Sequence, residues 1–518
     1  MEDYNAGAWL VDRHVAGGRG DAVAIRCQGR STTYAALQRG LWRAQNLLAA
    51  LGVGAGERVA LVLRDDEDFP ALFLGALRSG VVPVPLSTML KGPALAAILA
   101  DAGAKALAIS DVFAEAAPTI VAGAPALEHV ILCGDPSALD GVEVGAQVHS
   151  LASAGEGEAP VAATTAESPG FWLYSSGTTG VPKGVMHRHG DLQATYETYA
   201  RGVLGVGAED RFLSVAKLFF AFGLGNALTF PFAAGGTAIL HPDPPRPAAI
   251  AALVAAERPT LLFSSPGFCA ALLDAGLDPA IFASVRATVT AGEALPAAIH
   301  ARFVALTGSP VLDGIGSTEL LHIFISNTLD EQTPGSSGAV VPGYEAELRD
   351  SDDAPIAAPD APGFLFVRGP SAATGYWRRP EATAAAFPRR RGWVRTGDVY
   401  VRSASDRWTF LGRNSDMIKA GGIWVSPAEV SERPPRPPDR ARGGGGRRPR
   451  SARARDGRRL RRRRHRRGDR RARAHAARAP QVAAFKRPRR IEVVEALPKT
   501  ATGRSAASRL RAHLERSS

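Results

Sequence analysis

Residues 174–184 read Tyr-Ser-Ser-Gly-Thr-Thr-Gly-Val-Pro-Lys-Gly, and the rest of the chain is best interpreted around this stretch. It follows an apolar run at 171–174 that is typical of a buried strand, and it precedes residues 185–200, which we expect to continue as a helix. Glycine lets the backbone curl, hydroxyls and amides donate hydrogen bonds, and lysine adds positive charge. The composition therefore predicts an anion-binding loop, although Gly-x-x-x-x-Gly-Lys-Ser/Thr does not fit. The order of the eleven residues disfavours the alternative, an ordinary Ser/Gly turn.

Length and cysteine usage set the broad class of protein. A chain of 518 residues is too long for one hydrophobic core, so we expect two or more domains. Cys27, Cys133 and Cys269 lie far apart and offer neither a disulfide framework nor a metal-ligand spacing, which fits a reducing cytoplasm. The N-terminus is acidic and lacks a hydrophobic stretch, so we expect a cytoplasmic protein without a signal peptide.

One uncharged stretch, residues 218–240, has about the length of a membrane span. Several glycines, Asn226 and Pro231 interrupt it. We therefore interpret it as buried helix, loop and strand, and we expect no membrane partner.

The net charge of +12 comes from one segment of the chain. Residues 431–480 hold 21 Arg and no Lys against four acidic residues, or +17, while the remainder has 41 basic and 46 acidic residues, or −5. Within 431–484 Arg, Pro, Gly and Ala dominate, and such a sequence cannot bury enough apolar surface to fold, so we predict disorder. Nucleic-acid binding through the Arg run is an alternative function, but no aromatic residue interleaves the run to stack on bases.

The order of apolar runs predicts an α/β fold. Residues 1–165 alternate short strands with Ala/Leu-rich helices, which indicates a mostly parallel sheet covered by helices, and a second α/β layer of similar construction follows the loop. From Gly338 short strands bounded by Gly and Pro indicate a β-rich subdomain. We therefore predict a large N-terminal domain of two α/β subdomains plus a β-rich subdomain, followed by a small α+β C-terminal domain that is disrupted by the Arg-rich segment.

The loop and five later stretches together resemble the acyl-activating (adenylate-forming) enzyme superfamily. The later stretches are Ala291–Leu295, Asp313–Glu319, Arg395–Asp398, Gly412–Asp416 with Gly421-Gly422, and Leu497–Gly503. The resemblance covers residues 10–430 and 485–504. Within the superfamily the chain looks most similar to benzoate–CoA ligases, through residues 216–226 and 314–327.

This resemblance implies a two-step reaction that consumes ATP and coenzyme A and uses Mg²⁺. A carboxylate attacks the α-phosphate of ATP to give an acyl-adenylate, and the thiol of coenzyme A then displaces AMP to form a thioester. An adenylating enzyme that loads a carrier protein is a further alternative. The resemblance also implies a domain at 1–413 that binds ATP and an aryl acid, a C-terminal lid at 414–518, and a monomer or homodimer.

Residues that match the family's nucleotide motifs are expected to hold ATP and the metal ion. The phosphate loop would comprise Ser175, Ser176, Gly177, Thr178, Thr179, Gly180 and Lys183. Thr318 would bind the α-phosphate, and Glu319 would ligate Mg²⁺, which prefers carboxylate and phosphate oxygens. Asp398 would accept the ribose hydroxyls, with Arg413 beside the ribose or phosphate. The backbones of Gly292–Glu293 and Asp313–Gly314 would frame the adenine.

The same resemblance implies a flat apolar slot for an aromatic ring. Its lining would comprise Phe220, Ala221, Phe222, Gly223, Ala291, Gly314, Ile315, Gly316, His322 and Ile323. The small residues would leave room for the ring. Phe222 stands where many relatives have Tyr, which favours unsubstituted benzoate or a near analogue over a hydroxylated acid. We expect His322 to be a packed, neutral wall residue and not a catalytic one.

Three departures from the family pattern concern the C-terminal part. Arg504 stands where the family has the Lys that bridges the substrate carboxylate and the α-phosphate, and a displaced electrostatic donor typically costs about 10²–10³ in rate. Ser415 replaces the usual acidic hinge about which the lid rotates. Residues 431–484 replace the family's α/β core, and our hypothesis is a shifted reading frame in GC-rich DNA, which resequencing of the gene would test.

Overall fold

The computed structural model describes residues 2–175, 182–388 and 392–414, together with the backbone of four short strands further along the chain. These strands are β23 (Ile418–Ala420), β24 (Ile423–Val425), β25 (Arg458–Arg462) and β26 (Arg490–Val494). The predictions for residues 176–180, for Ser415 and for Arg504 lie outside the described residues. Inside the Arg-rich segment the structure has β25, which pairs in parallel with β26; the rest of that segment is also outside them.

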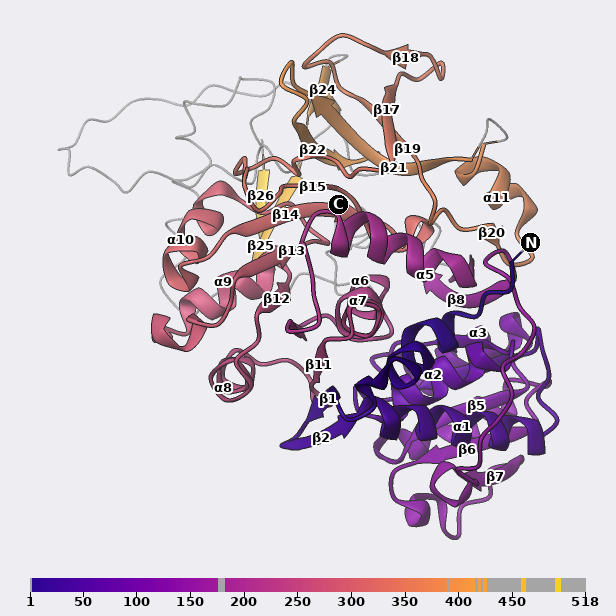
Figure 1. Cartoon of the computed structure of the whole chain (residues 1–518). Coiled ribbons are helices and arrows are strands. Elements are labelled where there is room, and N and C mark those ends of the chain that lie inside the picture. The colour runs from indigo at the N-terminus through magenta and orange to yellow at the C-terminus, as the bar shows by residue number, and fades with distance from the viewer. Residues whose placement is uncertain are drawn as a thin grey trace, which may run out of the picture.

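The first α/β subdomain is a five-stranded parallel sheet in the order β4-β3-β5-β6-β7. Strands β3 to β6 consist almost entirely of buried residues, which is typical of a parallel sheet covered on both faces, whereas the edge strand β7 has no buried residue. This confirms the alternation predicted from the sequence, and Figure 1 shows the subdomain in indigo to purple with its helices packed around the sheet. The strands are β3 (Arg58–Val62), β4 (Val82–Pro85), β5 (Ala106–Ser110), β6 (His129–Cys133) and β7 (Gln147–Ser150); the helices are α1 (Tyr34–Ala50), α2 (Asp68–Arg78), α3 (Gly92–Ala102) and α4 (Ala117–Ala122).

The second α/β subdomain is a nine-stranded sheet in the order β16-β15-β14-β13-β12-β10-β11-β1-β2. From β1 to β14 neighbouring strands run parallel, and both ends are closed by antiparallel strands. The strands are β1 (Val23–Cys27), β2 (Arg30–Thr33), β10 (Arg211–Ser214), β11 (Thr237–Leu240), β12 (Leu261–Ser264), β13 (Ala287–Thr290), β14 (Val311–Gly316), β15 (Ile323–Ser326) and β16 (Ala339–Val340); helices α8 (Pro247–Glu257), α9 (Pro266–Asp274) and α10 (Ala297–Thr307) connect them.

The predicted β-rich subdomain is an antiparallel sheet in the order β18-β17-β19-β21-β22, at the top of Figure 1. It places Asp398 and Arg413 directly opposite one another, on β21 and β22. Its strands are β17 (Glu345–Arg349), β18 (Pro355–Ile356), β19 (Gly363–Arg368), β21 (Trp393–Arg402) and β22 (Trp408–Arg413); α11 (Pro380–Ala386) lies between β19 and β21 in the chain.

The strands on either side of the phosphate loop pair as a β-hairpin, and the prediction of a helix over 185–200 is wrong at its start. Strand β8 (Pro169–Ser175) pairs antiparallel with β9 (Lys183–Arg188), and β20 (Gly375–Tyr376) extends the sheet. The cross-strand hydrogen bonds hold residues up to 188 in an extended conformation, so α5 (His189–Thr195) begins only after them.

Residues 218–240 form buried helix followed by strand, as the sequence predicts. The segment begins with α6 (Ala221–Leu224), continues through a π-helical turn at Gly225–Thr229 and α7 (Phe230–Ala234), and leads into β11. Within the described ranges, no helix is long and apolar enough to cross a bilayer.

Candidate functional site

The two ends of the phosphate loop are held together by the hairpin, because Ser175 on β8 is paired with Lys183 on β9. The ammonium of Lys183 lies 5.2 Å from the centroid of the Tyr376 ring. The Tyr376 hydroxyl donates to Oε1 of Glu319 at 2.9 Å. Burial, and then the Glu319 carboxylate, raise the pKa of Tyr376 well above its ordinary value, so this tyrosine is a neutral donor. Residues from β9, β20 and the 318–320 turn therefore meet at one place.

Glu319 is the candidate metal ligand. Among the described residues no group of three or more His, Cys, Asp or Glu side chains could enclose a metal ion. A single carboxylate suits Mg²⁺, which usually binds through one or two carboxylates together with substrate phosphates and water. The site therefore fits a Mg²⁺ ion that arrives with a nucleotide, and not an all-protein metal cage.

The Asp398 carboxylate is buried and ionically paired. Arg413 Nε lies 3.0 Å from Asp398 Oδ1, and Arg413 Nη1 donates to the carbonyl of Thr396 at 2.9 Å. Asp398 is only 2% exposed, whereas taken alone its sequence context suggests a turn residue. The arginine thus holds the carboxylate in a fixed position at this edge of the β-rich sheet.

The two backbone segments predicted at the adenine lie against each other. Asp313, on β14, accepts a hydrogen bond from Thr290 Oγ1 at 2.8 Å and a longer one from the amide of Leu295 at 3.4 Å. Its side chain thus ties the loop that contains Gly292 and Glu293 to the strand that continues into Gly314. Burial raises the pKa of Asp313 to about 7.

The predicted aryl-slot residues come from α6, from the end of β13 and from the β14–β15 hairpin. The ring centroids of Phe222 and His322 are 5.5 Å apart, and Gly316 pairs with Ile323 across the hairpin. His322 Nε2 lies 3.0 Å from Asn226 Oδ1. Burial lowers the pKa of His322 to about 3, so the ring is neutral, in agreement with a packed wall residue.

Backbone packing requires glycine at two positions in the slot, which the sequence does not reveal. A Cβ at Gly223 would lie 2.0 Å from the carbonyl oxygen of Lys217, and one at Gly316 would lie 2.5 Å from that of His322. Both positions exclude a side chain because backbone packs directly against them. The sequence suggests instead that these glycines make room for a ring.

Phe219 and Phe220, which precede α6, line the same cavity as the end of β8, the strand that leads into the phosphate loop. Tyr174, Ser175, Pro182, Phe219 and Phe220 make up half of the lining of this cavity of about 60 Å³, and residues 85–98 supply the other half. The predicted acid-binding residues therefore adjoin the predicted phosphate-binding residues.

Sequence reasoning missed several residues that hold the site together. Tyr376 is one, and the His187–Asp191 pair beneath Thr318 is another. Asp65 is a third, and its buried carboxylate accepts the Leu218 amide at 3.3 Å. Asp65 Oδ2 also lies 3.9 Å from Lys217 Nζ. His187 and Asp191 lie four residues apart inside the stretch 185–200, for which the sequence analysis predicts a helix and no functional residue.

The fold brings the residues predicted to bind a nucleotide close to those predicted to form an apolar slot, an arrangement expected of a nucleotide-dependent enzyme. A family model described as AMP-binding enzyme matches residues 12–377, and this chain belongs to that family of adenylate-forming enzymes.

Individual relatives and solved structures show which enzymes of this family the chain resembles. The chain is 39% identical to a benzoate–CoA ligase from Thauera aromatica, over 83% of this chain and 80% of the relative. It is also 39% identical to a 4-hydroxybenzoate–CoA/benzoate–CoA ligase from Rhodopseudomonas palustris, over 83% and 79%. A benzoate CoA ligase from Burkholderia xenovorans LB400 superimposes with a TM-score of 0.84 and 33% identity, over 98% of this chain and all of that one. These findings confirm the resemblance to adenylate-forming enzymes of the benzoate–CoA ligase type.

Proposed function

We propose that this protein activates an aromatic carboxylate, benzoate or a near analogue, with ATP and transfers the acyl group to coenzyme A. In the first step a carboxylate oxygen attacks the α-phosphorus and pyrophosphate leaves. In the second step the sulfur of coenzyme A attacks the acyl carbon, and AMP leaves as the thioester forms. The observation that carries the proposal is the shared cavity, which puts Phe219 and Phe220 beside Ser175 of the phosphate loop.

The residues around Tyr376 would bind the triphosphate. Lys183 would lie along the β- and γ-phosphates, and Thr318 would donate to the α-phosphate, where negative charge develops as the bond forms. Donors fixed in advance at such a position contribute several kcal/mol to the stability of a transition state. Tyr376 would hold Glu319 in place by its hydrogen bond to Oε1. Mg²⁺ bound through Glu319 would neutralise charge on the phosphate oxygens.

The remainder of the nucleotide would lie between the second α/β subdomain and the β-rich sheet. The carboxylate of Asp398, held by Arg413, would accept the ribose hydroxyls. The segments joined by Asp313 would flank the base. These positions would direct the α-phosphate toward Thr318 and the aryl slot.

The aryl slot favours a ring without a polar substituent at the position that faces Phe222. Phe222 offers only an aromatic edge, and His322 is neutral with Nε2 directed to Asn226. A hydroxyl placed beside Phe222 would lose its bonds to water without gaining a partner from that ring, which costs affinity. We therefore propose benzoate as the preferred acid, ahead of 4-hydroxybenzoate.

The acid preference is tested by acid-dependent exchange of pyrophosphate into ATP, with benzoate compared with hydroxybenzoates and with alkyl acids. We expect the highest kcat/KM for benzoate and a fall of about tenfold or more when a hydroxyl is added. An equal or higher kcat/KM for an alkyl acid would contradict an aromatic substrate class. The cytoplasmic location and the state as monomer or homodimer remain predictions, and light scattering of the purified protein tests the latter.

A further inference from the structure

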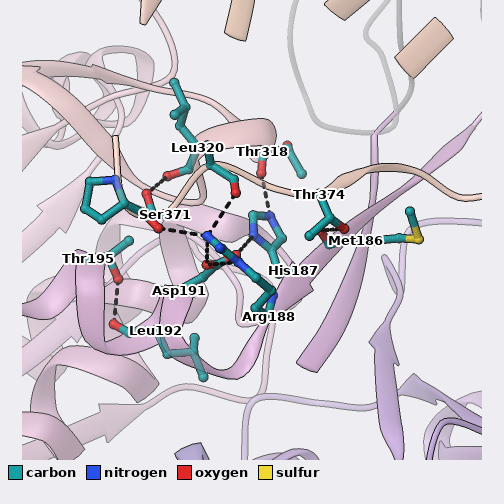
Figure 2. Close-up of polar contacts among 12 residues, drawn as sticks. Met186, His187, Arg188, Asp191, Leu192, Thr195, Thr318, Leu320, Ser371 and Thr374 are labelled. Atoms are coloured by element: carbon teal, nitrogen blue, oxygen red, sulfur yellow. Dashed lines mark hydrogen bonds and ion pairs between the residues drawn. The ribbon is translucent and has the colours of Figure 1, made fainter. Parts of the chain in front are cut away.

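His187 is a buried histidine that the proposed reaction leaves without a role. It lies on β9, its side chain is fully buried, and its ring stacks on Phe171 with centroids 5.1 Å apart and planes 16° apart. Figure 2 shows its imidazole between Asp191 and Thr318, with a polar partner on each side.

Both partners of the His187 ring accept hydrogen bonds. Nδ1 lies 2.9 Å from Asp191 Oδ2, and Nε2 lies 2.8 Å from the carbonyl oxygen of Thr318. The Asp191 carboxylate also receives the backbone amide of Arg188 at 3.1 Å and the guanidinium of Arg188 at 2.8 and 3.0 Å. A carbonyl oxygen carries no proton. Nε2 therefore donates to the Thr318 carbonyl, while Asp191 holds the other side of the ring.

The neighbouring carbonyls of the same turn are held as well. The Glu319 carbonyl accepts the amide of Ala373 at 2.9 Å, and the Leu320 carbonyl accepts Ser371 Oγ at 2.7 Å. The loop that supplies these donors is itself bound by Arg188, whose Nη2 donates to the carbonyl of Pro370 at 2.9 Å. The Thr318 carbonyl receives His187 Nε2 at 2.8 Å and, from within the turn, the amide of Leu321 at 3.2 Å, so His187 is its link to the hairpin.

We propose that His187 is a positioning residue: through its Nε2–H it fixes the backbone of Thr318 where the side chain can meet the α-phosphate of a bound nucleotide. This inference rests on the proposed role of Thr318. It adds a path from the hairpin that carries the phosphate loop to the turn that carries the phosphate and metal contacts. One hairpin thus orients both groups that hold the triphosphate.

Substituting His187 by glutamine or by asparagine tests its two hydrogen bonds separately. A glutamine amide reaches about as far as Nε2 and an asparagine amide about as far as Nδ1, so His187→Gln keeps the donor to Thr318 while His187→Asn keeps only the partner of Asp191. His189 gives a matched control: it is equally buried, burial lowers its pKa to about 4, and its Nδ1 accepts the amide of Ala6, outside the turn, at 3.1 Å. His189→Asn therefore makes the same chemical change in a neighbouring histidine.

The readout is the ratio of the Kd for adenosine to the Kd for AMP, measured by calorimetry on the full chain. The ratio isolates the phosphate contact and needs no turnover. We expect His187→Asn to lower it about tenfold, the loss typical of one hydrogen bond to a charged group, and His187→Gln and His189→Asn to leave it within about threefold of wild type.

The proposal is overturned if His187→Asn and His187→Gln give the same ratio, or if His189→Asn lowers it as much. It is also overturned if the wild type binds AMP no more tightly than adenosine. The proposed function fails separately, when the wild type forms no adenylate from any aromatic acid although the ratio responds to His187 as described.

Discussion

Substituting Gly223 by alanine tests whether the aryl slot depends on the close approach between α6 and the turn before it. The added Cβ would lie 2.0 Å from the carbonyl oxygen of Lys217, 2.5 Å from its carbonyl carbon and 2.6 Å from the carbonyl oxygen of Ala216. All three atoms are backbone, so no side chain can rotate away. The helix must move instead, and α6 carries Ala221 and Phe222 with it.

The expected loss in kcat/KM follows from the distance of 2.0 Å between the added Cβ and the carbonyl oxygen of Lys217. Cβ contacts below 3.0 Å are essentially never observed, so the backbone must separate by about 1 Å, and a displacement of that size at a substrate-positioning element costs about 10² in rate. The overpacking itself costs about 1–3 kcal/mol of stability. We therefore expect Gly223→Ala to lower kcat/KM for benzoate about 100-fold.

The assay is benzoate-dependent pyrophosphate release, with the Kd for AMP measured on the same samples. The Kd for AMP should stay within about twofold, because the nucleotide contacts come from other elements. Gly207→Ala is the control, since a Cβ there meets no atom within 4 Å. A Gly223→Ala enzyme whose kcat/KM stays within threefold of wild type would refute the argument, as would an equal loss in Gly207→Ala.

Three further predictions concern buried polar groups. Asp65→Ala leaves the buried amide of Leu218 without its acceptor and should lower the free energy of unfolding in urea by about 1–3 kcal/mol; an unchanged urea midpoint would show that the contact is dispensable. Asp398→Asn removes the negative charge opposite Arg413 and one of the two carboxylate acceptors, so the Kd for ATP should rise about 10-fold or more, while an unchanged Kd would remove Asp398 from the ribose site. The folded-state pKa of His322 is lowered to about 3, so below pH 6.5 the unfolded chain binds a proton that the folded chain does not, and this term destabilises the fold by about 2 kcal/mol at pH 5. His322→Gln abolishes that term, and urea unfolding of both proteins at pH 7.5 and pH 5 would contradict this if their difference were independent of pH.

The sequence predicted most of the fold because the buried parallel strands are continuous apolar runs. Arg58–Val62 and Ala106–Ser110 could be recognised in this way, and the family motifs placed the candidate site residues along the chain. The helix predicted over 185–200 was wrong at its start because α5 follows β9 without a turn, so the apolar pattern of a strand and of a helix ran together.

The contacts that hold the site together could not be predicted, because they join distant parts of the chain. His187 and Thr318 are 131 residues apart, and only the hairpin geometry brings them within hydrogen-bond distance. The glycine at 223 showed the same limit. The small size of this residue suggested space for a ring, whereas the structure shows a backbone contact with Lys217 that no residue with a side chain could make.

The most direct test of the account is formation of an aryl-CoA thioester from ATP, Mg²⁺ and coenzyme A by the wild type and by Arg504→Lys, over a panel of aromatic and alkyl acids. We predict benzoyl-CoA as the main product of both proteins, with a rate for Arg504→Lys about 10²–10³ higher if the arginine misplaces the bridging charge. No thioester from any acid, even after the lysine is restored, would contradict the claim that this chain is an aromatic acid–CoA ligase.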